Sequence, residues 1–228
     1  MATAKLSDYR KIIADAAERL VKSGILTKSN HGNISAKIPG SDTFLLTSVS
    51  NLAQITMDNI GLFDLENNLL DGSVMPISAE IIPMHGIVYK TRPDSGGALH
   101  THSPFATAFA VASRAMPVSY EPMVRFGMAE GVPVAGYGPR GSQESVDNIE
   151  KVLNGQDNLR GILLENHGVL TFGADVPAAV DANLVMEECA EIIMYAYNLG
   201  GPKEIPVDMR VAAQQRAQSF AAIGERRA

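Results

Sequence analysis

Two short segments on either side of a Pro-Gly pair constrain the fold more than any other feature of the chain. Residues 33–38 alternate polar and apolar side chains, and residues 43–47 form a second short apolar run. Alternation with a period of two predicts a strand, and the tight connection through Pro39 and Gly40 predicts an antiparallel hairpin. A sheet that contains such a hairpin is not wholly parallel, because parallel strands need a long crossover between them.

The rest of the chain mixes helical and strand patterns without strict alternation, which favours α+β or a mixed sheet over a doubly wound parallel one. Helices are expected at 6–22, at about 78–91, after Ser103, at 142–153 and from Asp175 to about 199. Further strands are expected at 60–65, 69–72, 97–102, 132–135 and 161–165. No repeat or flexible linker divides the sequence, so we expect residues 1–205 to form one domain, followed by a C-terminal helical tail at 206–228.

Composition excludes several classes of protein. Of the 228 residues, 46% are hydrophobic, which is enough for a full core and too many for a disordered chain. The formal net charge of −6 argues against nucleic acid or an anionic membrane surface as a partner. No signal-peptide pattern or bilayer-spanning apolar run is present, and a single cysteine fits a reducing compartment. We therefore expect a cytoplasmic protein with no membrane and no nucleic acid among its partners.

The strongest chemical signal is the pair His100 and His102 at the end of an expected strand. Side chains at positions i and i+2 of a strand point to the same face, so both imidazoles would project together. Two neutral ring nitrogens on one face could share a metal ion at about 2.0–2.1 Å. The alternative interpretation is a pair of ordinary polar residues at a strand end.

A third histidine, His167, follows the strand expected at 161–165 and precedes a glycine, so it could reach the same spot. Three imidazoles with one open position would form a catalytic zinc site. The two remaining histidines are interpreted as a turn residue, His31, and a packed or surface residue of a helix, His85. Spacing alone does not choose a fourth ligand among the carboxylates. The candidates are Glu80, Asp94, Glu121 and Glu165.

Several short motifs occur in a characteristic order over residues 6–200. They are Gly32-Asn33-Ile34-Ser35, Ser78-Ala79-Glu80, Arg92-Pro93-Asp94, His100-Thr101-His102 and Asn166-His167-Gly168. Their order and intervals resemble the class II aldolase/adducin family. The resemblance implies a single three-layer α/β domain with a mixed, largely antiparallel central sheet flanked by helices. It also implies a homotetramer whose active sites lie between neighbouring subunits.

The resemblance assigns roles to individual residues. His100, His102 and His167 match the family's zinc ligands, where Mn²⁺ or Co²⁺ could replace Zn²⁺. Glu80 matches a carboxylate that ligates the free metal and serves as acid or base once substrate displaces it. The positions that hold the substrate's phosphate in the family's aldolases match Asn33, Thr47, Ser48 and Ser78.

Two departures from the family pattern affect these assignments. The family's phosphate loop contains a glycine, whereas residues 47–50 read Thr-Ser-Val-Ser, so a carboxylate or hydroxyl could replace the phosphate. The family's proton-donating tyrosine comes from a neighbouring subunit and falls at Glu121 by strict counting. We assign this role to the adjacent Tyr120, with Tyr137 as a second candidate.

The expected function is that of a metal-dependent lyase acting on a small anionic molecule. It would cleave a C–C bond of a hydroxy-ketone or sugar phosphate by a retro-aldol reaction through a zinc-stabilised enediolate. A metal-dependent decarboxylase of a keto or hydroxy acid is the main alternative, since loss of CO₂ generates the same enolate. A sugar-phosphate 4-epimerase is less favoured, because the family's epimerases carry Asp in place of Glu80. A non-catalytic adducin-like assembly module is also less favoured, because such modules lack the complete ligand set.

Overall fold

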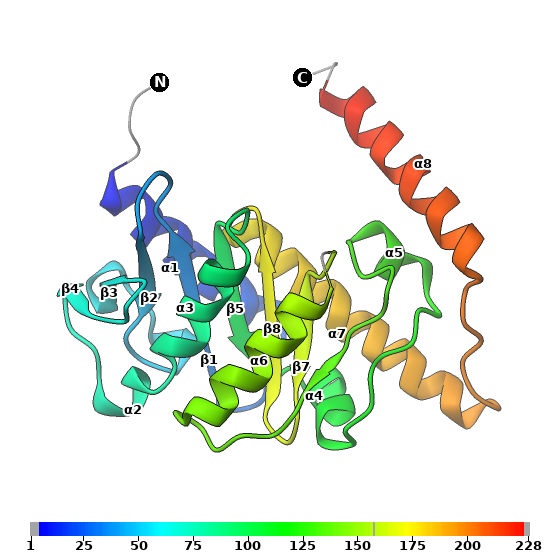
Figure 1. Ribbon diagram of the computed structural model, residues 1–228, viewed down its shortest axis with the longest axis horizontal. Coiled ribbons are helices and arrows are strands. Elements are labelled where there is room, and N and C mark those ends of the chain that lie inside the picture. The colour runs from blue at the N-terminus through cyan, green and yellow to red at the C-terminus, as the bar shows by residue number, and fades with distance from the viewer. Residues whose placement is uncertain (1–4, 157, 226–228) are drawn as a thin grey trace.

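A computed structural model describes residues 5–156 and 158–225 (Figure 1). Within these residues, eight strands form one sheet in the order β4-β3-β2-β1-β5-β8-β7-β6. The strands are β1 (Gly32–Lys37), β2 (Thr43–Thr47), β3 (Ile60–Asp64), β4 (Leu69–Asp71), β5 (Gly97–Thr101), β6 (Val134–Ala135), β7 (Gly161–Leu164) and β8 (Gly168–Gly173). Among the described strands only β6 and β7 pair in parallel, so the sheet is mixed and largely antiparallel, as the family resemblance implies.

Helices cover both faces of the sheet. On one face, in front of the strands in Figure 1, α3 (Ile82–Thr91) packs beside α6 (Gln143–Gly155). On the other face, α1 (Leu6–Ser23) packs beside the long α7 (Val176–Asn198). The remaining helical segments are α2 (Pro76–Ala79), α4 (Pro104–Val111), α5 (Glu121–Arg125), α8 (Val207–Glu225) and 3-10 turns at Leu52–Gln54 and Met57–Asn59. Two helical layers around one sheet confirm the expected three-layer α/β fold.

The local sequence explains where the main helices begin. Ser142 Oγ accepts a hydrogen bond from Ser145 N at 3.2 Å at the start of α6, and Asp175 Oδ1 accepts from Ala178 N at 2.8 Å at the start of α7. Such side chains satisfy backbone N–H groups that have no partner within the helix. Pro104 occupies the first position of α4, where its missing N–H costs nothing.

Three elements differ from the sequence expectations. The pattern does not predict β8, which pairs with both β5 and β7 and so depends on long-range contacts. It also does not predict the short helix α5. The single helix expected at 78–91 is wrong, because the chain divides into α2 and α3. Pro83 lies in the first turn of α3 and has no N–H to donate to the carbonyl of Ala79, so the helix cannot continue through this point.

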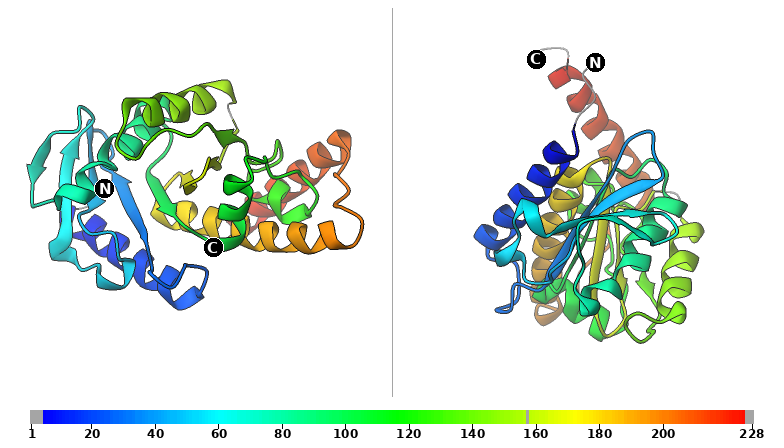
Figure 2. Two further views of the ribbon diagram at one scale, coloured as in Figure 1. Left: turned by 90° about the horizontal axis from the view of Figure 1, so that it is seen from below. Right: turned by 90° about the vertical axis from the view of Figure 1, so that its left-hand side faces the viewer.

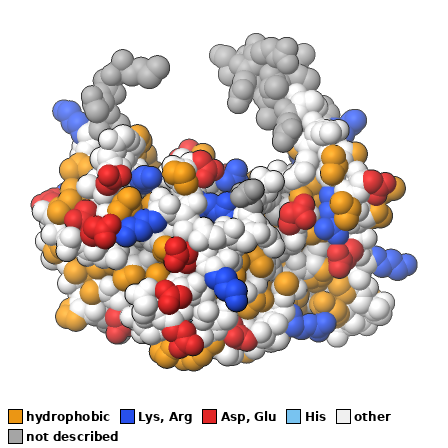
Figure 3. Space-filling view, in the orientation of Figure 1, with side chains coloured by type: hydrophobic (Ala, Val, Ile, Leu, Met, Phe, Trp, Pro, Cys, Tyr) orange, Lys and Arg blue, Asp and Glu red, His pale blue; other side chains and the backbone are white. Residues whose placement is uncertain are grey.

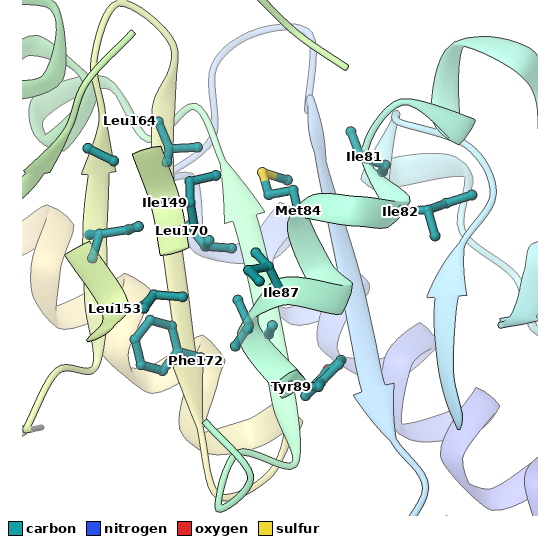
Figure 4. Packing of buried hydrophobic residues seen from close by; sticks show 14 of the residues in the cluster. Ile81, Ile82, Met84, Ile87, Tyr89, Ile149, Leu153, Leu164, Leu170 and Phe172 are labelled. Atoms are coloured by element: carbon teal, nitrogen blue, oxygen red, sulfur yellow. The ribbon is translucent and has the colours of Figure 1, made fainter. Parts of the chain in front are cut away.

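Large apolar side chains fill the space between the sheet and its helices. Figure 4 shows the layer beneath α3 and α6, where Ile87, Leu153 and Phe172 are buried together. On the opposite face Leu20 of α1 and Val180 of α7 belong to a second buried cluster. Each fully buried side chain of this size contributes about 1.5–3 kcal/mol. This packing holds the strand ends in fixed positions.

The two ends of the sheet differ in what they present. The β7–β8 turn and the end of β5 lie at the lower end in Figure 1, whereas α1 begins and α8 ends at the upper end. Figure 2 shows α8 projecting from the body of the domain. Figure 3 shows acidic and basic side chains interspersed over the face that carries α6. Among the described helices, none is both long enough and apolar enough to cross a membrane.

Candidate active site

Three histidines from two segments meet at the lower end of the sheet. His100 lies on β5, His102 follows the strand, and His167 lies in the β7–β8 turn. One ring nitrogen of each lies within 4.8 Å of the corresponding atoms of the other two. Because β5 pairs directly with β8, the strand pairing itself brings the segments together. The structure thus gathers the three residues that the sequence nominates as metal ligands.

Gly168 lets the β7–β8 turn approach β5 this closely. A Cβ atom at position 168 would lie 2.6 Å from the carbonyl oxygen of Thr101 and 2.8 Å from His102 Cδ2. Asn166 has a φ of 54°, a left-handed conformation that asparagine tolerates better than most residues. The Asn-His-Gly sequence therefore meets the steric demands of the turn that presents the third histidine.

The hydrogen bonds of His100 define its tautomer. Its Nδ1 donates to the carbonyl oxygen of Val169 at 2.8 Å, so Nε2 carries a lone pair. Within the described chain, the Nε2 atoms of His100 and His102 are buried and have no hydrogen-bond partner. Burial lowers the pKa of His100 well below its ordinary value, and burial together with His167 lowers the pKa of His102 to about 4. Both rings are therefore neutral near pH 7.

These rings fit a divalent metal ion. A buried polar atom without a partner costs about 1–3 kcal/mol unless a ligand uses it. Neutral imidazole nitrogens are common zinc ligands. The contact from His100 Nδ1 to a backbone carbonyl is the kind of outer hydrogen bond that orients a ligating imidazole. The three histidines could thus hold an ion and leave a position open for substrate.

A fourth histidine, His31, stacks on the ring of His102. Their centroids are 4.7 Å apart and their planes are inclined by 22°. His31 precedes β1 and forms a β-bridge with Asn51, so it lies beside the loop that follows β2. Burial, and to a lesser extent Arg140, lowers its pKa. The interpretation of His31 as an ordinary turn residue misses this contact, which no sequence spacing reveals.

Glu80 does not belong to the group of mutually close ligand atoms. Its Oε2 lies 3.2 Å from Nε of Arg140, and its side chain is 48% exposed. Arg140 lies in the loop before α6, and its charge lowers the pKa of His31, His102 and His167. Arg140 therefore connects Glu80 with the histidines and places a positive charge beside them. Sequence analysis does not nominate Arg140.

The four residues expected to contact substrate lie on neighbouring segments. Asn33 on β1 is directly opposite His100 in the β1–β5 pairing. Ser48 follows β2, and its carbonyl oxygen accepts from Met75 N at 3.4 Å, which brings the start of α2 beside this loop. Ser78 lies within α2. The pairing of β1 with β2 and β5 thus draws these positions toward the histidine end of the sheet.

Of the four residues expected to contact substrate, two have hydrogen-bonded hydroxyl groups and two have polar atoms without a described partner. Thr47 Oγ1 accepts from Ile34 N at 3.2 Å, and Ser48 Oγ donates to the carbonyl oxygen of Asn59 at 2.7 Å. Both contacts tie strand ends together. By contrast, Asn33 Nδ2 and Ser78 Oγ are buried and have no partner in the part of the chain that the structure describes. Asn33 and Ser78 therefore keep polar atoms available for a ligand.

The structure does not bring Tyr120 to the histidines of its own chain. Tyr120 directly precedes α5, near the upper right of Figure 1, and its hydroxyl donates to Glu188 Oε1 on α7 at 3.3 Å. Glu188 raises the pKa of Tyr120. Tyr137 is 52% exposed and lies three residues before Arg140. A catalytic role for Tyr120 thus requires a neighbouring subunit.

Comparisons with known proteins agree with this geometry. The family model of the class II aldolase and adducin N-terminal domain matches residues 11–194. The chain belongs to this family. Among its curated relatives is 5-deoxy-D-ribulose 1-phosphate aldolase from Bacillus thuringiensis serovar kurstaki, which is 29% identical over 206 residues. The match covers 89% of this chain and 92% of the relative.

Members of the class II aldolase family catalyse different reactions. A solved structure of L-fuculose 1-phosphate aldolase has a TM-score of 0.84 and 27% identity, covering 95% of this chain and 98% of that one. The 3-oxo-tetronate 4-phosphate decarboxylase of Haemophilus influenzae is 27% identical over 183 residues, covering 78% of this chain and 81% of the relative. An L-ribulose-5-phosphate 4-epimerase from Salmonella paratyphi C is also a relative. Family membership alone therefore leaves the particular reaction undetermined.

Proposed function

We propose that this protein is a zinc-dependent lyase that cleaves a carbon–carbon bond of a phosphorylated hydroxy-ketone by a retro-aldol reaction. The proposal rests on His100, His102 and His167, two of which have buried Nε2 atoms without a described partner. Zinc is the proposed ion because it favours imidazole ligands, and Mn²⁺ or Co²⁺ could replace it. When bound, the ion supplies Lewis-acid stabilisation of negative charge that develops on substrate oxygens.

Glu80 is the residue proposed to move the proton. In a retro-aldol cleavage, the hydroxyl beside the breaking bond loses its proton and becomes the carbonyl of the departing aldehyde. The electron pair of the broken bond stays with the ketone fragment, whose carbon is then protonated. Glu80 lies beside Arg140, whose charge acts on three of the histidines, and this supports a place for Glu80 at the margin of the centre. In the absence of substrate Glu80 is proposed to be a further metal ligand.

The proposed substrate carries an anionic group, and the phosphorylated substrates for which the relatives are named favour a phosphate. Asn33 Nδ2 and Ser78 Oγ would donate to its oxygens, while Thr47 and Ser48 hold the surrounding loops in place. Arg140 adds a positive charge that acts on His31, His102 and His167. Because residues 47–50 lack the family's glycine, these side-chain donors would carry more of the anion binding than the backbone does.

A decarboxylase of a keto or hydroxy acid is the second candidate, and Arg140 favours it. A guanidinium group can bind a carboxylate through two parallel hydrogen bonds, which would hold such an acid beside the centre. Loss of CO₂ leaves the bonding electrons on the ketone fragment, as loss of an aldehyde does. The same residues could therefore serve either reaction. The decarboxylase among the relatives also supports this candidate.

A substrate panel decides between the two reactions. Zinc-loaded protein is incubated with ketose 1-phosphates, their unphosphorylated forms and phosphorylated keto acids, while aldehyde and CO₂ are measured. We expect a ketose 1-phosphate to yield dihydroxyacetone phosphate and an aldehyde. Release of CO₂ from a keto acid, without aldehyde from any ketose, would support the second candidate instead. Metal-loaded protein that releases neither product from any compound would contradict both.

We also propose that the protein acts in the cytoplasm as a homotetramer with active sites between subunits. Leu199, Val207 and Met209, at the end of α7 and the start of α8, are 88%, 67% and 60% exposed, and such apolar surface is typical of interfaces. The single buried Cys189 fits a reducing compartment. Light scattering should give four times the 24.3 kDa chain mass, and Tyr120→Phe should lower turnover without dissociating the tetramer. A fully active monomer would contradict this arrangement.

A further inference from the structure

A chain of buried polar side chains lies between α3 and β1, next to the histidine centre. Asn33 and Ser35 are two residues apart on β1 and so face the same side of the sheet. His85 and Tyr89 are four residues apart on α3 and so share one side of the helix. All four side chains are buried, and Figure 4 shows α3, with Tyr89, lying over the strands.

Three hydrogen bonds join these side chains in series. Asn33 Oδ1 lies 2.6 Å from His85 Nε2, His85 Nδ1 lies 2.6 Å from Ser35 Oγ, and Ser35 Oγ lies 2.6 Å from the hydroxyl of Tyr89. An amide oxygen only accepts, so His85 Nε2 donates to Asn33. Burial lowers the pKa of His85 to about 3, so the ring is neutral and Nδ1 accepts from Ser35. Ser35 in turn accepts from Tyr89. Every proton in the series therefore has a defined position.

This order of donors fixes the direction of the Asn33 amide. Because His85 holds Oδ1, the Nδ2 group points elsewhere, and it is buried without a partner among the described residues. Asn33 is directly opposite His100, and side chains of directly opposed residues lie on the same face of a sheet. His85 is also close enough for its charge to act on the pKa of His100. The N–H groups of Asn33 that have no described partner thus lie on the face of the sheet that carries His100.

The arrangement costs stability unless a ligand completes it. A buried amide N–H group without a partner is unfavourable by about 1–3 kcal/mol. The neighbouring Ser35, His85 and Tyr89 satisfy one another's hydrogen bonds, so within this series the Nδ2 group of Asn33 is the one without a described partner. Buried polar networks whose members are satisfied rigidify the core and specify one side-chain arrangement. The Asn33 amide is therefore a donor available to a ligand.

We propose that His85 is a positioning residue that holds the Asn33 amide with its N–H groups toward the histidine centre, where they donate to an anionic oxygen of the substrate. Ser35 donates to His85 Nδ1 and so maintains the tautomer that His85 needs for this task, whereas Tyr89 contacts Ser35 and not His85. His85 acts through Asn33 and does not touch the substrate. The inference rests on the proposed function, because it assigns the ligand of Asn33 to the anionic group of that substrate.

A double-mutant cycle tests whether His85 acts through Asn33. Zinc-loaded wild type, Asn33→Ala, His85→Leu and the double variant are titrated calorimetrically with dihydroxyacetone phosphate. We expect about 30-fold weaker binding for Asn33→Ala, about 10-fold for His85→Leu, and no more than the Asn33→Ala loss for the double variant. Independent losses that multiply to about 300-fold in the double variant would overturn the inference.

Two further variants separate positioning from general support of the fold. In His85→Gln an amide N–H can still donate to Asn33, so binding should recover to within about threefold of wild type. Tyr89→Phe keeps the contact between His85 and Asn33 and should change binding by less than about twofold. All variants should retain the wild-type zinc content, and KM should change more than kcat. A His85→Gln variant as impaired as His85→Leu would contradict positioning.

A measurement on unmodified protein keeps the inference testable if His85→Leu does not fold. Nitrogen-15 NMR should show His85 as the neutral Nε2–H tautomer between pH 5 and 9, and the Asn33 side-chain amide signals should shift when dihydroxyacetone phosphate is added. An Nδ1–H tautomer would overturn the inference. Failure of wild-type protein to bind zinc would instead contradict the proposed function. The tautomer of His85 would still show which atoms donate and which accept in the series of hydrogen bonds from Tyr89 to Asn33.

Discussion

Successive residues at the end of β5 belong to two buried polar regions on opposite faces of the sheet. In one region polar atoms lack described hydrogen-bond partners, and in the other they are all hydrogen-bonded. His100 and His102 project to one face of the sheet, where their Nε2 atoms have no described partner. Thr101 and Ser103 project to the other face, toward α7, and their hydroxyl oxygens lie at hydrogen-bond distance, 2.8 Å apart. Asn183 of α7 donates to Thr101 Oγ1 at 3.0 Å and accepts from Ser103 Oγ at 3.1 Å. The end of β5 thus separates an open region, whose Nε2 atoms have no described partner, from a closed region, whose polar side chains bond to one another.

The closed region continues along α7. Glu187 is 4% exposed, and its two carboxylate oxygens accept from Phe105 N and Ala106 N at 2.8 Å each, at the start of α4. None of the side-chain polar atoms of Thr101, Ser103, Asn183 and Glu187 is left without a partner in the described structure. Buried polar atoms that satisfy one another serve the fold, whereas several open ones gathered at one strand end point to a binding site.

The largest expected effect is a difference in turnover between substitutions at two adjacent residues of β5, His100 and Thr101. His100→Ala should lower turnover by about 1000-fold or more, because it removes a metal ligand and its outer hydrogen bond. The variant should stay folded and lose about 0.5–1.5 kcal/mol of stability, because the hydrogen bond from Nδ1 to the carbonyl oxygen of Val169 is lost while Nε2 has no partner in the described chain. Thr101→Val is the matched control and should keep metal and turnover while losing stability. Steady-state kinetics and calorimetry measure both, and equal turnover in the two variants would contradict the comparison.

Arg140→Gln should weaken substrate binding without removing the metal. Loss of the positive charge beside the histidines should raise KM for an anionic substrate by about 10- to 100-fold, the range expected for one charge-assisted hydrogen bond. Arg125 is an exposed residue of α5, so Arg125→Gln is the control and should leave KM within about twofold. KM against ionic strength gives a second check. An unchanged KM in Arg140→Gln would remove Arg140 from the site.

Asn183→Leu should damage the closed region alone. It leaves the hydroxyl groups of Thr101 and Ser103 without their partner, which should lower the free energy of unfolding by about 1–3 kcal/mol. Zinc content should stay at the wild-type value, because the histidines project to the other face. Urea denaturation and metal analysis test the two halves of this prediction. Zinc loss without loss of stability would reverse the assignments of the two regions.

The smallest expected effect is the pH dependence contributed by Glu187. Burial raises the pKa of Glu187, and this outweighs the opposing effect of its two backbone hydrogen bonds. A raised pKa in the folded state means that the stabilisation is fully present below the ordinary value of 4.5 and is lost as pH rises through the folded value. The unfolding free energy of wild type should therefore fall relative to that of Glu187→Gln as pH rises above 4.5. Parallel profiles would contradict this assignment.

Local sequence signals predict most of the fold. The helix expected at 6–22 is α1, and the hairpin around Pro39 and Gly40 pairs β1 with β2. The strand β8 escapes prediction because glycines bound it and its pairing partners, β5 and β7, lie elsewhere in the chain. Helix α8 occupies Val207–Glu225 of the tail expected at 206–228, whose last three residues lie outside the described part of the chain.

The site is predictable only where its residues lie in local motifs. The spacing of His100 and His102 on one strand is a local signal, and the structure places both beside His167. Arg140 and His31 give no such signal, because their neighbours in the fold lie about 60 to 70 residues away in the chain. His85 is similar, since its role depends on β1. Contacts between loops, helices and strands that are distant in the chain decide these positions, and local spacing does not encode them.

Zinc binding by unmodified protein tests the central claim most directly. Protein stripped of metal by a chelator is titrated with zinc in competition with a chromophoric chelator, alongside His100→Ala and His167→Ala. We expect one tightly bound zinc ion per chain for wild type and none for either variant, with circular dichroism showing that all three are folded. Folded wild-type protein that binds no zinc, or variants that bind it as well as wild type, would contradict the account.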